Sequence, residues 1–193
     1  MTETALGWHA HATSIAPRPA RPGRDRPESL AAPRYAAPMP LAAKVLTVSD
    51  GVAARTREDA AGPALAARLE AAGFAVAARD VVADDTAAIA AALTEMARDF
   101  FGLIVTTGGT GFGPRDTTPE ATHLVIERAA PGLAEAMRRA DPLGRLSRGV
   151  AGTVGETLVL NVPGSPAGAV EHLEAVLDVL PHALELLAGG RPH

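Results

Sequence analysis

Apolar residues fall into short, dense runs at intervals along most of the chain. The runs are rich in Val, Ile, Leu and Thr, which are residues that favour buried strands. We predict strands at residues 45–48, 74–82, 103–107 and 158–162.

Between these runs, apolar residues recur every three or four positions, which is the spacing of a helix that buries one face. Asp59 and Asp85 precede two such segments as N-caps, and Gly73 follows the first as a helix stop. We predict helices at residues 60–72, 86–99, 119–129, 133–139 and 166–187, with a kink at Pro181 in the last.

The order of these elements indicates an α/β fold. Strands that alternate with helices predict a mostly parallel sheet with right-handed crossover connections. Residues 150–154 and 158–162 are joined by a short Gly155-Glu156 turn, which predicts an antiparallel hairpin. The sheet is therefore expected to be mixed at one edge.

The first 40 or so residues differ from the rest. They contain seven prolines and five arginines between residues 17 and 40, and they show no apolar periodicity. Such a segment cannot bury enough apolar surface to offset the entropy of ordering. We expect a disordered N-terminal tail at residues 1–40 and one domain at residues 41–193.

Composition narrows the classes of function. The net charge is −4, and no basic block lies outside the tail, so nucleic acid is not expected as a partner. Cysteine is absent, which excludes disulfides and thiolate chemistry. No apolar run approaches the roughly 20 residues that span a bilayer, so no membrane contact is expected. A soluble, cytoplasmic protein is the expectation.

The central stretch, residues 103–120, reads L-I-V-T-T-G-G-T-G-F-G-P-R-D-T-T-P-E. It predicts a buried strand, a glycine-rich loop and a helix start in which Thr118 is the N-cap and Pro119 the first helical residue. Unshielded backbone N–H groups beside a helix N-terminus favour an anion. A tight turn in an α/β sheet is the alternative interpretation, because neither a P-loop nor a G-x-G-x-x-G pattern is present.

Three acids fall at predicted strand ends or in the loops that follow: Asp50, Asp84 and Asp116. Ligands of parallel sheets bind beyond the carboxyl ends of the strands. A carboxylate beside a phosphate site repels the ligand unless a cation lies between them, so Mg²⁺ is expected there. Asp50 could equally serve only as a turn former.

Residues 161–166, N-V-P-G-S-P, form a second loop that leads into a helix. No Ser/His/Asp arrangement is apparent, and His123, His172 and His182 lie on predicted helices without a metal-ligand pattern. We expect these histidines on the surface or as satisfied core residues. Acids and glycine loops without a nucleophile fit phosphoryl or nucleotidyl transfer.

The ordered sequence closely resembles the MoaB/Mog family, the molybdopterin adenylyltransferases of molybdenum-cofactor biosynthesis. Seven sequence blocks carry the resemblance in order. They are V-S-D (48–50), E-D-A-A-G-P-A-L (58–65), V-V-A-D-D (81–85), G-G-T-G-F-G-P-R-D-T-T-P-E-A-T (108–122), P-G-L-A-E-A-M-R (131–138), L-S-R-G-V-A-G (146–152) and L-N-V-P-G-S-P (160–166). Together they span about residues 43–187.

The resemblance implies a three-layer α/β/α fold with a mostly parallel sheet and an antiparallel edge hairpin, assembled as a homotrimer. It implies Mg²⁺-dependent transfer of AMP from ATP to molybdopterin, with release of pyrophosphate, before a second protein inserts molybdenum. The family's two essential acids, which hold the metal, match Asp84 and Asp116. The nucleotide would be lined by Asp50, Gly108, Gly109, Thr110, Gly111, Asn161, Gly164 and Ser165. The molybdopterin side would be formed by Glu135, Ser147 and Arg148.

Two positions depart from the family pattern. Gly51 stands where an Arg often follows the Ser-Asp pair, and Asp141 stands where a small polar residue is common. Like-charge repulsion at Asp141 would weaken binding of an anionic substrate. A non-catalytic molybdopterin-binding or scaffold paralogue is therefore the main alternative. A domain for nucleotide-pyrophosphate cleavage, as in competence proteins, is a second alternative, although those proteins usually carry a further domain.

Overall fold

The structure, a computed structural model, describes residues 41–189. The predicted N-terminal tail therefore lies outside the described residues. The described part forms a six-stranded sheet in the order β2-β1-β3-β6-β5-β4. The strands are β1 (Ala42–Val48), β2 (Ala75–Val82), β3 (Gly102–Thr107), β4 (Arg128–Ala129), β5 (Ala151–Val154) and β6 (Thr157–Val162).

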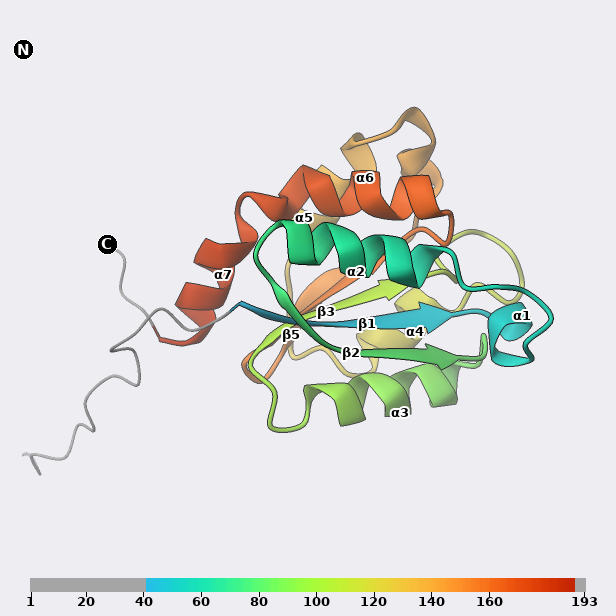
Figure 1. The fold of residues 1–193 in the computed structure, drawn as a ribbon, viewed down its shortest axis with the longest axis horizontal. Coiled ribbons are helices and arrows are strands. Elements are labelled where there is room, and N and C mark those ends of the chain that lie inside the picture. Colours follow the sequence, from blue (N-terminus) through green and yellow to red (C-terminus); the bar gives the residue numbers. More distant parts are fainter. Residues whose placement is uncertain (1–40, 190–193) are drawn as a thin grey trace, which may run out of the picture. The chain divides into compact units, whose positions relative to one another are not determined.

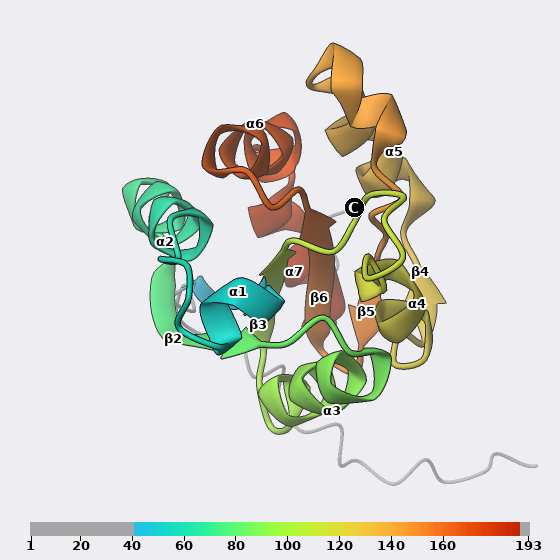
Figure 2. The same ribbon diagram turned by 90° about the vertical axis from the view of Figure 1, so that its right-hand side faces the viewer.

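The sheet is parallel on one side and antiparallel on the other, as the sequence predicts. β1 pairs in parallel with β2 and β3, and β3 pairs in parallel with β6. β5 and β6 form the predicted hairpin, and β4 extends it as an antiparallel edge strand. The carboxyl ends of β1, β3 and β6 therefore lie side by side (Figure 2).

Helices cover both faces of the sheet, which confirms the three-layer fold (Figure 1). One core lies beneath α2, α5, α6 and α7, and the other beneath α3 and α4. Successive residues of the central strands alternate between them: Leu103 and Val105 join the first core, and Ile104 joins the second. The helices are α1 (Asp50–Ala53), α2 (Ala61–Ala71), α3 (Thr86–Ala97), α4 (Thr118–His123), α5 (Pro131–Arg139), α6 (Pro166–Leu177) and α7 (Leu180–Leu187), and a 3₁₀ turn, η1, spans Pro142–Leu146.

Asp85 is the N-cap of α3, as predicted, whereas the N-cap of α2 is Ala60 and Asp59 lies one residue before it. Asp85 Oδ1 accepts a hydrogen bond from the Ala88 amide at 2.9 Å, and Asp59 Oδ1 accepts one from the Gly62 amide at 2.9 Å. Gly73 adopts φ of +87°, which ends α2 in the left-handed region. Capping chemistry therefore places these two helices correctly.

The predicted helix at 119–129 is wrong beyond His123. Beyond that residue the backbone pairs with β5 and does not continue the helix. The Glu127 amide donates to Thr153 O and the Ala130 amide donates to Ala151 O, each at 2.8 Å. The predicted helix at 166–187 divides into α6 and α7, with the break just before Pro181, which lies in the first turn of α7. Within residues 41–189, no helix is both long and apolar enough to cross a bilayer.

Candidate functional site

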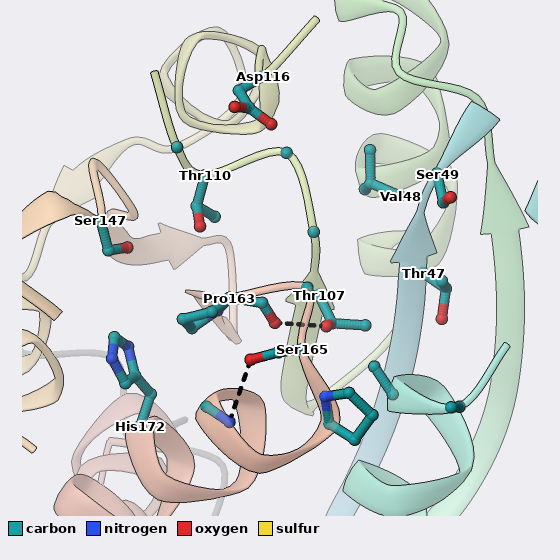
Figure 3. A pocket seen from close by; sticks show the side chains of 18 of the residues that line it. Thr47, Val48, Ser49, Thr107, Thr110, Asp116, Ser147, Pro163, Ser165 and His172 are labelled. Atoms are coloured by element: carbon teal, nitrogen blue, oxygen red, sulfur yellow. Dashed lines mark hydrogen bonds between the residues drawn. The ribbon is translucent and has the colours of Figure 1, made fainter. Parts of the chain in front are cut away.

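A cavity of about 800 Å³ opens at the carboxyl ends of β1, β3 and β6. The glycine loop that follows β3 forms one wall, and the loop that leads from β6 into α6 forms another. The short α1 region and η1 border the remaining sides (Figure 3). This is the edge at which parallel sheets bind their ligands.

The glycine loop needs glycine at two positions. Gly108 and Gly109 adopt φ of +99° and +62°. A Cβ at Gly108 would lie 2.2 Å from Val48 O, and a Cβ at Gly109 would lie 2.3 Å from Thr118 Oγ1. The backbone therefore passes close to β1 and to the start of α4, where no side chain fits.

Thr118 holds the loop from the side of α4. Its hydroxyl donates to Gly108 O at 2.9 Å, and its amide donates to Gly109 O at 3.1 Å. Both carbonyls are thus turned toward α4. Thr118 is fully buried, so these bonds are shielded from water.

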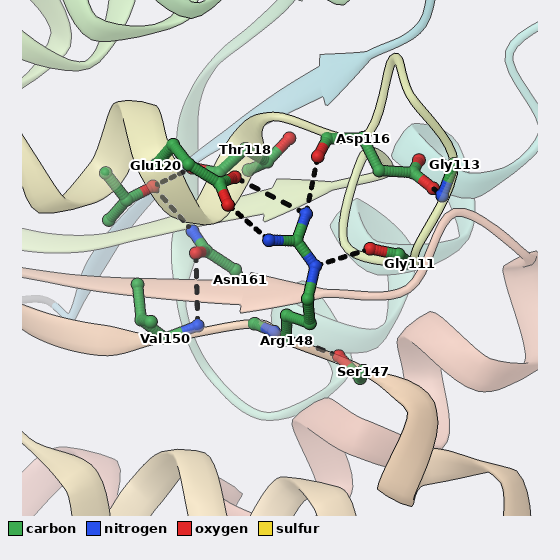
Figure 4. Close-up of polar contacts among 11 residues, drawn as sticks. Gly111, Gly113, Asp116, Thr118, Glu120, Ser147, Arg148, Val150 and Asn161 are labelled. Atoms are coloured by element: carbon green, nitrogen blue, oxygen red, sulfur yellow. Dashed lines mark hydrogen bonds and ion pairs between the residues drawn. The ribbon is translucent and has the colours of Figure 1, made fainter.

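Arg148 fixes the far side of the same loop (Figure 4). Its guanidinium donates to Gly111 O at 2.6 Å and to Asp116 O at 2.5 Å, and it forms an ion pair with Glu120. The pairing with Arg148 lowers the pKa of Glu120. A single side chain therefore joins two points of the glycine loop to the first turn of α4.

Asp84 and Asp50 meet where β1 and β2 end. The Asp50 amide donates to Asp84 Oδ2 at 2.7 Å, and the Asp84 amide donates to Asp50 Oδ1 at 3.0 Å. Arg115 of the glycine loop binds both oxygens of Asp50, at 2.9 and 3.0 Å, and lowers the pKa of that carboxyl. Asp84 lines the cavity, whereas Asp50 does not.

Asp116 also lines the cavity. Its Oδ2 accepts the Gly113 amide at 2.7 Å. Cβ atoms built on Gly111 and Gly109 would lie 2.9 Å from Asp116 Oδ2 and 3.2 Å from Asp84 Oδ1, respectively. The two carboxylates therefore flank the glycine loop.

The second loop brings a helix N-terminus to the cavity. Ser165 caps α6 by accepting the Gly168 amide at 3.3 Å, and Thr107 Oγ1 donates to Pro163 O at 2.7 Å. A Cβ at Gly164 would lie 3.2 Å from Gly108 Cα, so the two loops are in close contact. The positive end of α6 favours an anion at this wall.

Most of the predicted site residues lie together around this cavity. Its lining contains Asp84, Asp116, Gly108, Gly109, Thr110, Gly111, Ser147, Gly164 and Ser165. The other predicted residues, Asp50, Asn161, Glu135 and Arg148, are not part of the lining.

Asn161 belongs to the core. It is 1% exposed, and its amide donates to Thr106 Oγ1 and Thr122 Oγ1 and accepts the Val150 amide. Glu135 lies on the exposed face of α5 and pairs with Arg139 at 2.6 Å. The sequence resemblance assigned both to ligand binding, and the structure places both away from the cavity.

Several lining residues are absent from the predicted site. Thr47 Oγ1 donates to Asp59 Oδ2 at 2.9 Å, and Arg57 donates to Ser49 Oγ at 2.8 Å. His172 lines the cavity as a buried residue whose Nε2 has no partner in the described chain, so it is not the satisfied or exposed histidine expected. Thr47, Arg57 and His172 lie outside the quoted sequence blocks, and the fold brings them to this edge.

The donor set suits magnesium better than a softer metal. Residues 41–189 contain no group of three or more His, Cys, Asp or Glu side chains placed to hold a metal ion. Mg²⁺ is commonly held by one or two carboxylates together with substrate phosphates. Asp84 and Asp116, beside a phosphate-sized backbone cradle, fit that arrangement.

Comparisons with known proteins agree on one family. Residues 44–182 match a family described as "Probable molybdopterin binding domain". Molybdopterin adenylyltransferase of Helicobacter pylori is 40% identical over 115 residues, which cover 57% of this chain and 65% of the relative. The chain thus spans just under two thirds of that relative's length. The Escherichia coli enzyme of the same name is 36% identical over 126 residues, with 56% and 65% covered.

A crystal structure of the molybdopterin biosynthesis enzyme MoaB from Thermus thermophilus shares the fold. Its TM-score is 0.74 and its sequence identity is 49%, with 77% of this chain and 97% of that chain covered. The fold is thus found in a solved relative.

Proposed function

The chain belongs to the family of probable molybdopterin-binding domains, and from this premise we propose that it is a molybdopterin adenylyltransferase of molybdenum-cofactor biosynthesis. A terminal phosphate oxygen of molybdopterin would attack the α-phosphorus of ATP. The bond from the α-phosphorus to the bridging oxygen would break, and pyrophosphate would leave. The product is adenylylated molybdopterin.

One observation carries this proposal: two carboxylates flank a backbone cradle that faces a helix N-terminus in the same cavity. The cavity lining, as far as the chain is described, offers no Ser/His/Asp arrangement that would form a covalent intermediate. Nucleotidyl transfer needs little more than positioning and charge neutralisation, and these groups supply both.

Asp84 and Asp116 would hold Mg²⁺ through their carboxylate oxygens, together with oxygens of the triphosphate. The bound ion would neutralise negative charge that develops on the departing pyrophosphate. Within the chain, Asp50 would keep Asp84 oriented through their paired hydrogen bonds. Asp50 is then a positioning residue and not a nucleotide contact.

The phosphates would lie against Gly108, Gly109, Thr110 and Gly111, with Gly164 and Ser165 on the facing wall. Arg148 would position this loop and would not touch the pterin, since its guanidinium is used by Gly111, Asp116 and Glu120. Ser147 lines the cavity next to Arg148 and keeps its proposed place on the molybdopterin side.

The direct test incubates purified protein with ATP, Mg²⁺ and molybdopterin and measures adenylylated molybdopterin and pyrophosphate. Formation of both in equal amounts supports the proposal. Tight molybdopterin binding without either product would support the binding-only paralogue.

A homotrimer and a downstream molybdenum-inserting protein remain predictions from family resemblance. Light scattering at micromolar protein concentration tests whether the protein is a homotrimer. Transfer of adenylylated molybdopterin to a molybdate-dependent acceptor would measure the second.

A further inference from the structure

His172 is a buried polar side chain that the packing of the cavity leaves without a partner. It extends from α6, is 1% exposed and lines the cavity. Its Nε2 forms no hydrogen bond with any residue between 41 and 189. Buried polar groups are nearly always hydrogen-bonded, so an orphaned imidazole in a ligand-sized cavity calls for a ligand atom.

The ring lies against η1, at the end of the cavity away from the acids of the glycine loop. A Cβ at Gly144 would stand 3.1 Å from His172 Nε2, so the η1 backbone packs directly on the imidazole. Figure 3 shows His172 rising from α6 on the side of Ser147, with Asp116 at the other end of the labelled residues. The cavity therefore has a phosphate end and an imidazole end.

The chemistry of the imidazole end suits an uncharged ring. η1 and its flanks contribute Asp141, Leu143, Gly144, Leu146 and Ser147 to the lining. In the lining of the described chain, the lone Lys or Arg is Arg57, which is held by Ser49 beside β1. A phosphate at the imidazole end would thus meet the Asp141 carboxylate, and the described residues that line this end include no Lys or Arg.

Burial lowers the pKa of His172, so the ring is neutral near pH 7. The nearby Asp141 and Glu171 carboxylates oppose this shift, and Arg138 reinforces it. A neutral imidazole has one N–H donor and one lone pair. Such a ring can donate a hydrogen bond to a carbonyl oxygen of a ligand or accept one from an N–H group.

We infer that His172 is a specificity-determining residue that hydrogen-bonds the polar edge of the pterin ring, next to Asp141, which accepts N–H groups of the same edge. The inference rests on the proposed function. The aminopyrimidinone edge of a pterin presents adjacent N–H donors, which match one carboxylate, and a carbonyl oxygen. The polar edge of adenine places its amino group beside ring-nitrogen acceptors, whose lone pairs a carboxylate would repel. The two leucines of η1 would contact the faces of the ring.

The test compares ligand affinities of full-length variants by calorimetry, with molybdopterin and with Mg-ATP titrated separately. His172→Phe keeps a ring of similar size and removes both nitrogens. It should weaken molybdopterin binding about ten-fold, the effect of one lost hydrogen bond, and leave ATP affinity unchanged. His172→Gln restores a donor and an acceptor and should recover most of the affinity.

Two further variants separate ligand recognition from a structural role. His123→Phe is the matched control, because His123 is exposed on α4 and is not part of the cavity lining. It should bind both ligands as the parent does. His172→Phe should keep or raise the thermal midpoint, since it replaces an unpaired buried polar atom with an apolar one. If that variant fails to fold, Asp141→Asn decides, because it keeps the shape of the η1 cap and should weaken molybdopterin binding.

Parent-like molybdopterin affinity in His172→Phe would overturn the inference. If His172→Phe does not fold, parent-like molybdopterin affinity in Asp141→Asn would overturn it. If His172→Phe weakens binding of ATP and leaves binding of molybdopterin unchanged, the group at the imidazole end is adenine and not the pterin ring. A parent protein that shows the predicted dependence on His172 but forms no adenylylated product would refute the proposed reaction and leave the inference standing. A parent protein that does not bind molybdopterin would refute both.

Discussion

Asp50 and Asp84 each donate a backbone amide to the other's carboxylate, at 2.7 and 3.0 Å. The two residues follow different strands, so the exchange ties the end of β1 to the end of β2. Arg115 then holds Asp50 from the glycine loop. The Asp50 backbone amide thereby orients the Asp84 carboxylate, which lines the cavity.

Asp50→Ala removes the acceptor for the Asp84 amide and the partner of Arg115. We expect adenylylation to fall about ten-fold, because the Asp84 backbone loses its bond to the Asp50 carboxylate, while the Asp84 carboxylate keeps its charge and the bond from the amide of residue 50. Arg115→Gln is the matched variant, since it leaves the exchange between the two aspartates intact. Steady-state kinetics should show a smaller loss for Arg115→Gln, and equal losses would contradict the positioning role of Asp50.

Gly109→Ala tests whether the loop is a binding cradle. Gly109 has φ of +62°, and a Cβ would meet Thr118 Oγ1 at 2.3 Å. Gly155 of the β5–β6 turn is the control, with φ of +54° and nothing within 4 Å of a Cβ. Gly155→Ala should lower the free energy of unfolding by about 1–2 kcal/mol, which is the cost of placing an alanine backbone in the left-handed region.

Denaturant unfolding should show a larger loss of stability for Gly109→Ala than for Gly155→Ala. Calorimetry should show ATP affinity reduced more than about ten-fold in Gly109→Ala alone. Unchanged ATP affinity in that variant would mean that the loop is only a turn.

Arg148→Lys keeps the charge but loses the planar fork that reaches two carbonyls and a carboxylate. We expect the free energy of unfolding to fall by about 2 kcal/mol, together with weaker ATP binding. Arg139→Lys, in the exposed pair with Glu135, should change stability by less than about 0.5 kcal/mol. Equal effects of the two changes in denaturant unfolding would contradict the loop-holding role of Arg148.

His172 should make stability depend on pH. Burial lowers its pKa in the folded state, so below about pH 6.5 the unfolded chain takes up a proton that the folded chain does not. The free energy of unfolding should therefore decrease as pH falls through this window and level off below the folded-state pKa. His172→Phe should flatten this part of the profile, and parallel profiles for the two proteins would refute the assignment.

The sequence predicted the elements whose signals are local. The apolar run of β3, the Asp85 cap and the Gly73 stop all lie where expected, and Asp59 lies one residue before the N-cap of α2. β4 could not be predicted, because only its pairing with β5 overrides the helical pattern that follows Thr118. α1 was likewise missed, since its four residues depend on the Ser49 cap.

The site was partly predictable for the same reason. Gly109 and Asp116 could be predicted because glycines and an acid lie together in residues 103–120. Asp84 could be predicted because it follows a predicted strand. Asn161 lies in a loop motif, yet its strand register turns its amide into the core. His172 occupies an ordinary helical position, and its place in the cavity lining depends on how η1 packs over α6.

The central claim is that Asp116 acts through its charge. Asp116→Asn preserves the acceptor for the Gly113 amide, so the loop should still form. Single-turnover adenylylation should slow by about two orders of magnitude, which corresponds to roughly 3 kcal/mol of barrier, while molybdopterin affinity changes little. Asp178→Asn is the control, since Asp178 is exposed and does not line the cavity.

The decisive measurement is single-turnover adenylylation by the parent protein, Asp116→Asn and Asp178→Asn across a Mg²⁺ titration. Of the three proteins, Asp116→Asn alone should need more Mg²⁺, and its adenylylation rate should remain below that of the parent at saturating Mg²⁺. Asp116→Asn that adenylylates at the parent rate with the parent Mg²⁺ dependence would show that this carboxylate is only a loop residue.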